Sequence, residues 1–253
     1  MPAPVMEGAE PFSAAGDNGN GVLVCHGFTG NPQSMRPLAE AFAAAEFSVE
    51  LPLWPGHGTS IEDMLETGWA DWSGAAEVAY SELESRCDKV VVAGLSMGGT
   101  LATWLASRHP EIAGLIAINA AVEPPGEAFF DILRQTLEQG TTVMPAIGND
   151  VADPSQKELA YEGMPVAPLL TMMEAQADLD ARLSVIRCPT LIFTSRNDHV
   201  VPPSSSDYLA ERVGGPVERV FLDRSFHVAT IDYDRDEIAS RSVDFARKAV
   251  AGD

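Results

Sequence analysis

The sequence predicts a doubly wound α/β fold, in which a mostly parallel sheet is covered by helices on both faces. Short apolar runs rich in β-branched residues alternate with longer segments of helical periodicity along most of the 253 residues. The apolar runs are continuous, as in parallel strands that are buried on both faces. The helical segments between them are long enough to connect parallel strands or to close the sheet.

Six apolar runs are expected to form the strands. In chain order they are residues 21–28, 47–54, 89–94, 112–119, 190–194 and 217–222. A further edge strand is expected near Phe12. The helices expected with these strands are residues 37–45, 69–86, 97–108, 206–213 and 235–251.

The alternation is interrupted once, between Ala120 and Arg187. This stretch has no strand pattern and is rich in Met, Leu, Phe, Glu and Pro. We expect residues 1–253 to form a single domain, with a helical insertion at about residues 121–187. A chain of this length buries enough surface to fold as one unit.

Composition favours a globular protein, with 45% hydrophobic and 21% charged residues. No apolar run approaches the roughly 20 residues of a membrane span, so we expect no stable membrane insertion. The first twenty residues contain Glu7, Glu10 and Asp17 and have no apolar stretch typical of a secretory signal. A cytoplasmic location is therefore expected.

The net charge of −21, from 16 Lys and Arg against 37 Asp and Glu, disfavours nucleic acids and anionic lipid surfaces as partners. Neutral or cationic small molecules suit this charge better. The three cysteines, Cys25, Cys87 and Cys188, are far apart and form no C-x-x-C pair. They indicate neither a metal site nor a disulfide framework.

A nucleophile elbow is indicated by the segment GLSMGG at residues 94–99. It follows an expected strand and begins an expected helix, which is the context in which a serine is presented above the edge of a sheet. Glycines beside Ser96 allow the tight turn, and the helix amino terminus favours negative charge. Ser96 is therefore the expected nucleophile.

A serine needs a histidine base, and the chain contains five histidines. His26 and His57 lie in glycine-containing turns, where we expect them to brace loops, and His109 ends a helix. His199 is a weaker candidate for the base. His227 follows the last expected strand, at the edge where open α/β sheets bind ligands, and is the expected base.

The histidine in turn needs a carboxylate that holds the correct tautomer. Asp198 is the carboxylate in the turn after the strand at 190–194. The chain order Ser96, Asp198, His227 is that of hydrolases with a nucleophile elbow. Asp223, only four residues before His227, remains the alternative acid.

Two backbone N–H groups are expected to stabilise a tetrahedral oxyanion. The elbow supplies the N–H of Met97, and the loop HGFTG at residues 26–30 supplies that of Phe28. The side chains of both residues would then be free to line the substrate pocket.

Together these segments resemble the serine carboxylesterases and monoacylglycerol lipases of the α/β-hydrolase fold, with the small bacterial carboxylesterases nearest. The matching segments are HGFTG at 26–30, PGHG at 55–58, GLSMGG at 94–99, ND at 197–198 and HV at 227–228. The resemblance implies the same triad and oxyanion donors, no metal or organic cofactor, and a small helical cap inserted after the sixth strand.

We therefore expect a hydrolase that acts through an acyl-enzyme on uncharged monoesters of short to medium chain length, including monoacylglycerols. Apolar cap residues are expected to bind the acyl group together with Phe28 and Met97; these are Phe129, Phe130, Leu133 and Met172. The alternative is a hydrolase that cleaves a thioester or a carbon–carbon bond with the same triad. A protein that binds a small ligand without turning it over is a further, less favoured alternative.

Overall fold

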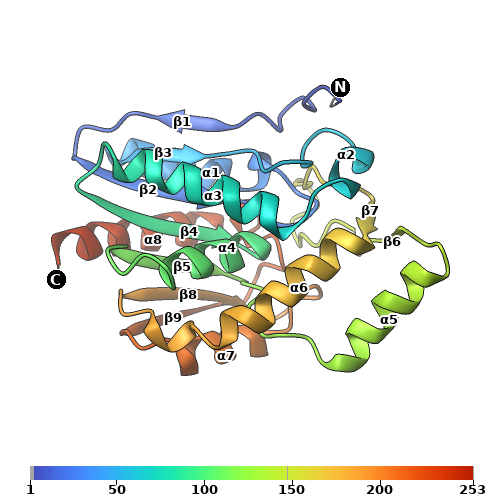
Figure 1. Cartoon of the computed structure of the whole chain (residues 1–253). Coiled ribbons are helices and arrows are strands. Elements are labelled where there is room, and N and C mark those ends of the chain that lie inside the picture. The colour runs from blue at the N-terminus through green and yellow to red at the C-terminus, as the bar shows by residue number, and fades with distance from the viewer. Residues whose placement is uncertain (1–2, 147, 253) are drawn as a thin grey trace.

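The structure is a computed structural model that describes residues 3–146 and 148–252. Within these residues, seven strands form the main sheet, in the order β1-β3-β2-β4-β5-β8-β9. The edge strand β1 runs antiparallel to β3, and the other neighbouring strands are parallel. Helices cover both faces (Figure 1). The predicted doubly wound fold class is confirmed.

The expected strands are all present, with ends that move by a few residues. They are β1 (Phe12–Ala14), β2 (Asn20–Cys25), β3 (Ser48–Leu51), β4 (Lys89–Leu95), β5 (Gly114–Ile118), β8 (Thr190–Ser195) and β9 (Val217–Leu222). The helices outside the insertion are α1 (Arg36–Ala44), α2 (Ile61–Leu65), α3 (Trp69–Glu84), α4 (Met97–Ala106), α7 (Ser204–Arg212) and α8 (Arg235–Ala251). Three short 3-10 turns are η1 (Pro32–Ser34), η2 (Leu183–Val185) and η3 (Ala229–Ile231). The five-residue α2 was not expected, because it is too short to show a helical period.

Apolar side chains of the central strands are buried on both faces of the sheet. Along β2, Val22 and Val24 belong to the core beneath α1 and α8, whereas Leu23 and Cys25 belong to the core beneath α3 and α4. Burying an aliphatic side chain of this size contributes about 1.5–3 kcal/mol. This double burial explains why the strands are continuous apolar runs in the sequence.

The insertion contains α5 (Glu127–Glu138), β6 (Val143–Pro145), β7 (Gly163–Pro165) and α6 (Val166–Asp180). The expectation of a purely helical insertion is wrong, because β6 and β7 form a small antiparallel sheet. Each strand has three residues and ends in proline, so neither gives an apolar run. The insertion also follows β5, the fifth strand in chain order and not the sixth. In Figure 1, α6 crosses in front of the sheet and α5 lies outside α6.

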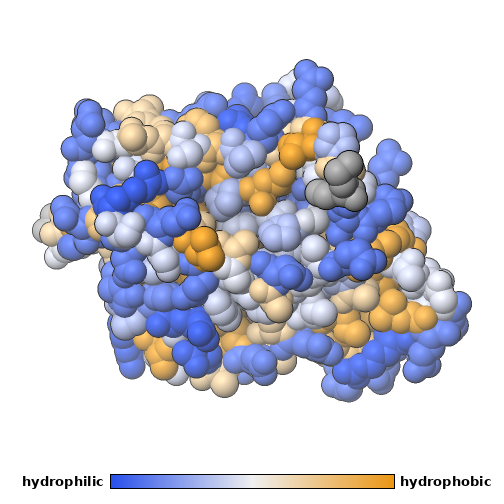
Figure 2. Space-filling view, turned by 45° about the horizontal axis from the view of Figure 1, so that its top comes forward, coloured by the Kyte–Doolittle hydropathy of each residue, from blue (hydrophilic) through white to orange (hydrophobic). Residues whose placement is uncertain are grey.

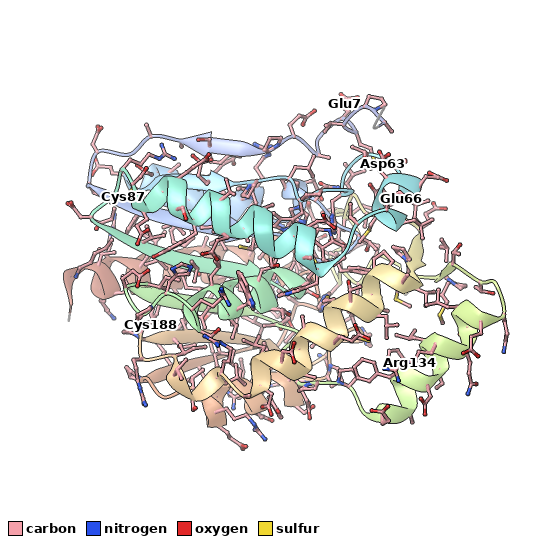
Figure 3. All side chains as sticks on the ribbon, viewed as in Figure 1. Glu7, Asp63, Glu66, Cys87, Arg134 and Cys188 are labelled. Carbon is pink, nitrogen blue, oxygen red and sulfur yellow. The ribbon has the colours of Figure 1, made fainter. Side chains whose placement is uncertain are left out.

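Hydrophilic residues predominate on the face shown in Figure 2, and apolar residues form separate small patches there. Acidic residues from separate segments gather at one end of the molecule, where Glu7, Asp63 and Glu66 lie near α2 (Figure 3). The Asp63 carboxylate accepts a hydrogen bond from the Ala3 N–H at 2.9 Å, which lowers the pKa of Asp63. Across residues 3–146 and 148–252, no helix is long and apolar enough to cross a membrane.

Candidate active site

Ser96 forms the turn between β4 and α4 in a backbone conformation that is strained for a residue with a side chain, at φ 55° and ψ −122°. The surrounding glycines make this turn possible. A Cβ on Gly94 would lie 2.1 Å from the carbonyl oxygen of Gly98, and one on Gly98 would lie 2.1 Å from that of Cys25. The structure therefore places Ser96 at the expected elbow, where close backbone packing fixes its position.

His227 and Asp198 lie together at the same edge of the sheet. The Nδ1 atom of His227 is 2.8 Å from Oδ2 of Asp198, and both side chains are almost completely buried. The other oxygen of Asp198 accepts the N–H groups of Val200 and Val201, each at 2.8 Å. An ionised carboxylate only accepts hydrogen bonds, so Nδ1 carries the proton and Nε2 of the neutral ring is left as a base.

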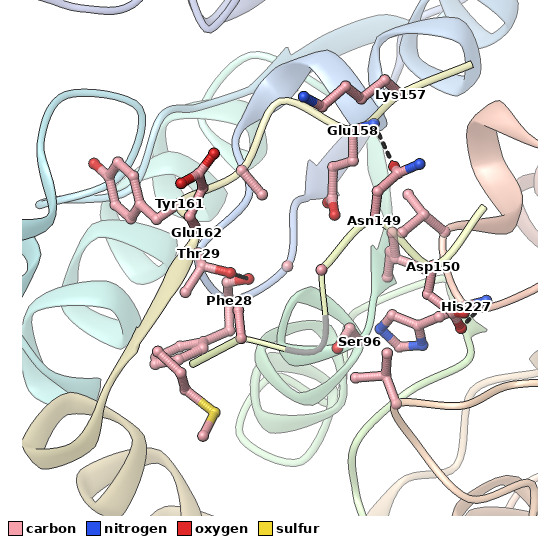
Figure 4. Close-up of a pocket in the computed structure, with 18 residues that line it drawn as sticks. Phe28, Thr29, Ser96, Asn149, Asp150, Lys157, Glu158, Tyr161, Glu162 and His227 are labelled. Atoms are coloured by element: carbon pink, nitrogen blue, oxygen red, sulfur yellow. Dashed lines mark hydrogen bonds between the residues drawn. The ribbon is translucent and has the colours of Figure 1, made fainter. Parts of the chain in front are cut away.

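A cavity of about 320 Å³ lies over these residues and has both Ser96 and His227 in its wall. Figure 4 shows the hydroxyl of Ser96 beside the His227 ring. Cavity walls also come from the loop after β2, at Gly27, Phe28 and Thr29. The arrangement brings a hydroxyl and a base to the wall of one cavity, with a carboxylate bonded to the base, as a hydrolase that forms an acyl-enzyme requires.

The backbone N–H groups of Phe28 and Met97 are the oxyanion donors expected from the sequence. Within the described part of the chain, neither group donates a hydrogen bond to the protein. Phe28 lies in the wall of the cavity. Met97 does not, because its side chain is fully buried in the core beneath α3 and α4, so its expected contact with substrate is wrong.

The loop that carries Phe28 is held by buried histidines. The Nε2 atom of His26 accepts the N–H of Trp54 at 3.2 Å, and its Nδ1 lies 3.0 Å from the carbonyl oxygen of Gly27. His57 packs edge-on against His26, with ring centroids 5.1 Å apart. Burial lowers the pKa of His57 to about 4 and that of His26 well below its usual range. Both rings are neutral, and they brace the loop as predicted.

The remaining wall of the cavity comes from a part of the insertion that the sequence did not single out. It includes Ala146, Gly148, Asn149, Asp150, Lys157, Glu158, Ala160, Tyr161, Glu162 and Met164. The cap residues expected there, Phe129, Phe130, Leu133 and Met172, do not line it. They lie on α5 and α6 instead, where Leu133 and Met172 are buried in the core. Phe130 is also buried, whereas Phe129 is 38% exposed, so part of the apolar spacing reflects packing of the two helices.

Several functional candidates were missed. Asp150 is buried and accepts the backbone N–H of His227 at 3.0 Å. Asn119, directly after β5, donates from Nδ2 to the carbonyl oxygen of His227 at 2.8 Å and to Oγ of Ser195 at 2.9 Å. Asn119 could have been found as a polar residue at the carboxyl end of a strand. Asp150 had no such signal, because it lies in an insertion without a predictable path.

Glu158 directs its carboxyl group into the cavity, whereas Lys157 extends along the rim (Figure 4). Burial raises the pKa of Glu158 to about 7, and His227, when it is protonated, acts in the opposite direction. Glu158 is therefore partly protonated at neutral pH and can donate as well as accept a hydrogen bond. It supplies a polar group on a wall that also contains apolar side chains.

Comparison with known proteins gives a family match and close relatives. A family model described as serine aminopeptidase, S33 matches residues 17–234. The chain is 47% identical over 247 residues to a thermostable monoacylglycerol lipase from Bacillus sp. (strain H-257), with 97% of each chain covered. It is 25% identical over 242 residues to a carboxylesterase from Bacillus subtilis (strain 168), with 94% of this chain and 96% of that protein covered.

Solved structures agree with the fold. A structure described with LipS and LipT, two metagenome-derived lipolytic enzymes, has a TM-score of 0.92 at 40% sequence identity and covers 97% of this chain and 100% of its own. The monoacylglycerol lipase of Paleococcus ferrophilus has a TM-score of 0.71 at 18% identity, covering 93% and 98%. At that identity the likeness concerns the fold.

Proposed function

This chain belongs to the α/β-hydrolase family that includes carboxylesterases and monoacylglycerol lipases, and from that premise we propose how it hydrolyses carboxylic esters. Ser96 is the nucleophile, His227 the general base and Asp198 the carboxylate that orients His227. The observation that carries this assignment is the convergence of the Ser96 elbow and the His227–Asp198 pair on one cavity.

In the acylation step, Nε2 of His227 takes the proton of Ser96 as Oγ attacks the ester carbonyl. The N–H groups of Phe28 and Met97 stabilise the negative charge on the carbonyl oxygen. His227 then gives its proton to the departing alkoxide, and an alcohol leaves. Water, activated by the same histidine, attacks the acyl-enzyme and releases the acid.

Substrates of this site are uncharged monoesters of short to medium acyl length, monoacylglycerols among them. The cavity of about 320 Å³ is at the small end of the range for ligand pockets, which suits one acyl chain better than three. Its apolar lining, which includes Leu95, Met164 and Val228, suits that chain. Glu158 and Asn149 offer hydrogen-bonding groups to the hydroxyls of a glycerol moiety. The name of the relative with 47% identity supports the same substrate class.

Residues 121–187 work as the cap of a single domain, since ten residues of this segment, the first Ala146 and the last Met164, line the cavity. A cytoplasmic location fits the cysteines, because Cys25, Cys87 and Cys188 are all free thiols. Nucleic acids are not partners, as the charge of −21 repels phosphate backbones.

The test of the assignment is Ser96→Ala. Without its nucleophile, the enzyme is expected to lose measurable turnover of p-nitrophenyl and monoacylglycerol esters, although oxyanion stabilisation alone retains on the order of 10³-fold over water in related triads. Labelling by a serine-directed phosphonate should disappear too, with an unchanged unfolding temperature. Labelling that persists in the variant would place the nucleophile elsewhere.

A further inference from the structure

A third carboxylate, Asp150, connects the two loops that carry the acid and the base. Its Oδ2 atom accepts the backbone N–H of His227 at 3.0 Å and that of His199 at 3.2 Å. Its Oδ1 atom lies 2.8 Å from Nδ1 of His199. Its main-chain carbonyl accepts the N–H of Val228 at 3.1 Å. Asp150 therefore bonds both to His199, which follows Asp198 in the chain, and to the base His227.

Asp150 belongs to the insertion and not to the sheet. The segment around it is fixed to the base loop a second time by Asp232, whose carboxylate accepts the N–H groups of Ala152 at 2.8 Å, Asp153 at 2.9 Å and Phe226 at 2.9 Å. The Asp150 side chain is only 10% exposed and also borders the cavity. The loop between β8 and α7, the loop after β9 and the cap therefore meet at this carboxylate.

We propose that Asp150 is a positioning residue for ester hydrolysis, which sets the distance between the Asp198 loop and the His227 loop and makes the active arrangement depend on docking of the cap. The proposal rests on the function proposed above. Hydrogen bonds to a buried carboxylate are strong and directional, so removing the carboxylate lets the two loops separate. A displacement of about 1 Å at a reacting group can cost about 100-fold in rate.

Asp150 also adds negative charge beside His227 at the point where its ring becomes positive in the transition state. Among the described residues, Asp198 contacts the His227 ring, Asp150 contacts its backbone and Glu158 couples to it across the cavity. Lys157, Tyr161 and Glu162 share the cavity wall with His227. His199 also contacts Asp150, with 53% of its side chain exposed. Loss of the Asp150 charge therefore disfavours protonated His227.

Asp150→Asn and Asp150→Ala test the proposal on the full chain, with Asp153→Asn as the matched control. Asp153 lies in the same segment, where its carboxylate accepts from Ser155 and lies 3.7 Å from Arg235, away from the triad. We expect kcat on a p-nitrophenyl ester to fall about 10-fold in the Asn variant and about 100-fold in the Ala variant, with KM changed by less than about threefold. The control should keep native kcat.

The pH dependence of kcat/KM distinguishes a positioning role of Asp150 from a simple loss of folded enzyme in the variants. In both Asp150 variants the acid limb of kcat/KM should move to lower pH by about 0.5–1 unit, because protonated His227 has lost a stabilising charge. Rates are divided by the concentration of active sites, measured by phosphonate titration. Native kcat with an unmoved acid limb overturns the proposal, and so does a lower unfolding temperature with native kcat per active site.

His199→Asn provides a second variant that keeps the Asp150 carboxylate. It removes one of the three contacts of that carboxylate, so we expect a loss of kcat of less than about threefold and an unmoved acid limb. A loss as large as that of Asp150→Ala would assign the effect to His199 and overturn the role of Asp150. If the native protein turns over no ester and takes no phosphonate label, the proposed function fails. The NMR titration of the His227 ring, moved to lower pH in Asp150→Asn, still tests Asp150 in that case.

Discussion

Asp198 and Asp223 both follow a strand of the sheet, yet their surroundings differ completely. The side chain of Asp198 is 1% exposed and contacts His227, whereas that of Asp223 is 75% exposed and pairs with Arg196 at 2.8 Å. An exposed pair of this kind contributes about 0–1 kcal/mol to stability and lies outside the cavity. The site therefore favours Asp198 as the carboxylate that orients the base.

Asp198→Asn is expected to lower kcat by about 10⁴-fold, because an amide at this position favours the wrong tautomer of His227. Asp223→Asn should have native activity, and it serves as the control because it makes the same chemical change one loop away. Steady-state kinetics on a p-nitrophenyl ester measures both. An active Asp198→Asn enzyme beside an inactive Asp223→Asn enzyme would reverse the assignment.

Glu158 is expected to make the free energy of unfolding depend on pH. Its pKa in the folded protein is raised to about 7, from an ordinary value of 4.5, so the folded state keeps a proton that the unfolded state releases between these pH values. Stability contributed by Glu158 is therefore present below about pH 4.5 and is lost as the pH rises through 7. Glu158→Gln should be more stable than the native protein at pH 8, by up to about 3 kcal/mol, with no gain at pH 4. Urea unfolding at both pH values measures this, and an equal effect at the two values would contradict it.

Among the elements, α4 and α3 each contain a glycine that can be replaced by alanine, Gly98 next to the Ser96 turn and Gly74 away from the site. A Cβ on Gly98 would meet the backbone of Cys25 at 2.1 Å, whereas one on Gly74, in the exposed part of α3, meets nothing within 4 Å. We expect Gly98→Ala to lose folded, active protein. Gly74→Ala should gain about 0.5–1 kcal/mol in the free energy of unfolding and keep native kcat. Thermal unfolding and active-site titration measure the stability and the active fraction of both variants. Equal stability of Gly98→Ala and Gly74→Ala would contradict the close packing described around Ser96.

The strands and the residues that follow them could be predicted from the sequence. The parallel strands were predictable because both faces are buried, and the range of β9, Val217–Leu222, matches its prediction at both ends. Ser96, Asp198 and His227 each directly follow or lie shortly after such a strand, so the topology alone brings them to one edge. Local signals of this kind determine position without any knowledge of distant contacts.

The insertion lacked signals of that kind. Apolar residues on α5 and α6 lie partly in the core, as Leu133 and Met172 do, and partly at the surface, as Phe129 does, so their spacing does not distinguish a neighbouring helix from a substrate. The residues that line the cavity are instead in irregular chain between β6 and β7, such as Asn149 and Glu158. Their positions depend on long-range contacts, among them the bond from Asn31 Nδ2 to the carbonyl oxygen of Leu159. No local pattern encodes such contacts.

For the whole molecule, the buried histidines His26 and His57 lower stability in acid, opposite in sign to the contribution of Glu158 between pH 7 and 4.5. The pKa of His57 is lowered by burial to about 4, so the unfolded chain takes up a proton below about pH 6.5 that the folded state refuses. Stability from this residue is present above pH 6.5 and is lost as the pH falls towards 4, by up to about 3 kcal/mol, and His26 acts in the same direction. Urea unfolding from pH 7 to pH 4.5 should show that the free energy of unfolding falls less, or rises more, in His57→Gln than in the native protein, because the contribution of Glu158 is common to both. A pH dependence that is identical in the two proteins would contradict a neutral, buried His57.

The size of the cavity and the negative charge of the molecule together predict which esters are hydrolysed fastest. Each methylene that enters the apolar part of the cavity contributes up to about 0.8 kcal/mol, so kcat/KM should rise with acyl length until the cavity of about 320 Å³ is full, and then fall. A carboxylate on the substrate meets a chain of charge −21 and a cavity wall in which Asp150, Glu158 and Glu162 outnumber Lys157. Anionic esters should therefore react more slowly than neutral esters of equal length, and added salt should narrow the difference because it screens the long-range part of the repulsion.

The measurement is a series of p-nitrophenyl and monoacylglycerol esters of increasing chain length, run beside a carboxylate-bearing ester of matched length at about 0.05 M and 0.5 M salt. Glu158→Gln separates local from global charge, since it removes one carboxyl group at the cavity and leaves the rest of the surface unchanged. At pH 8, where native Glu158 is ionised, this variant should accept the anionic ester better than the native enzyme does; at pH 5, where Glu158 is protonated, the two should be alike. Equal turnover of neutral and anionic esters by the native enzyme, or rates that do not depend on acyl length, would contradict this account of the cavity.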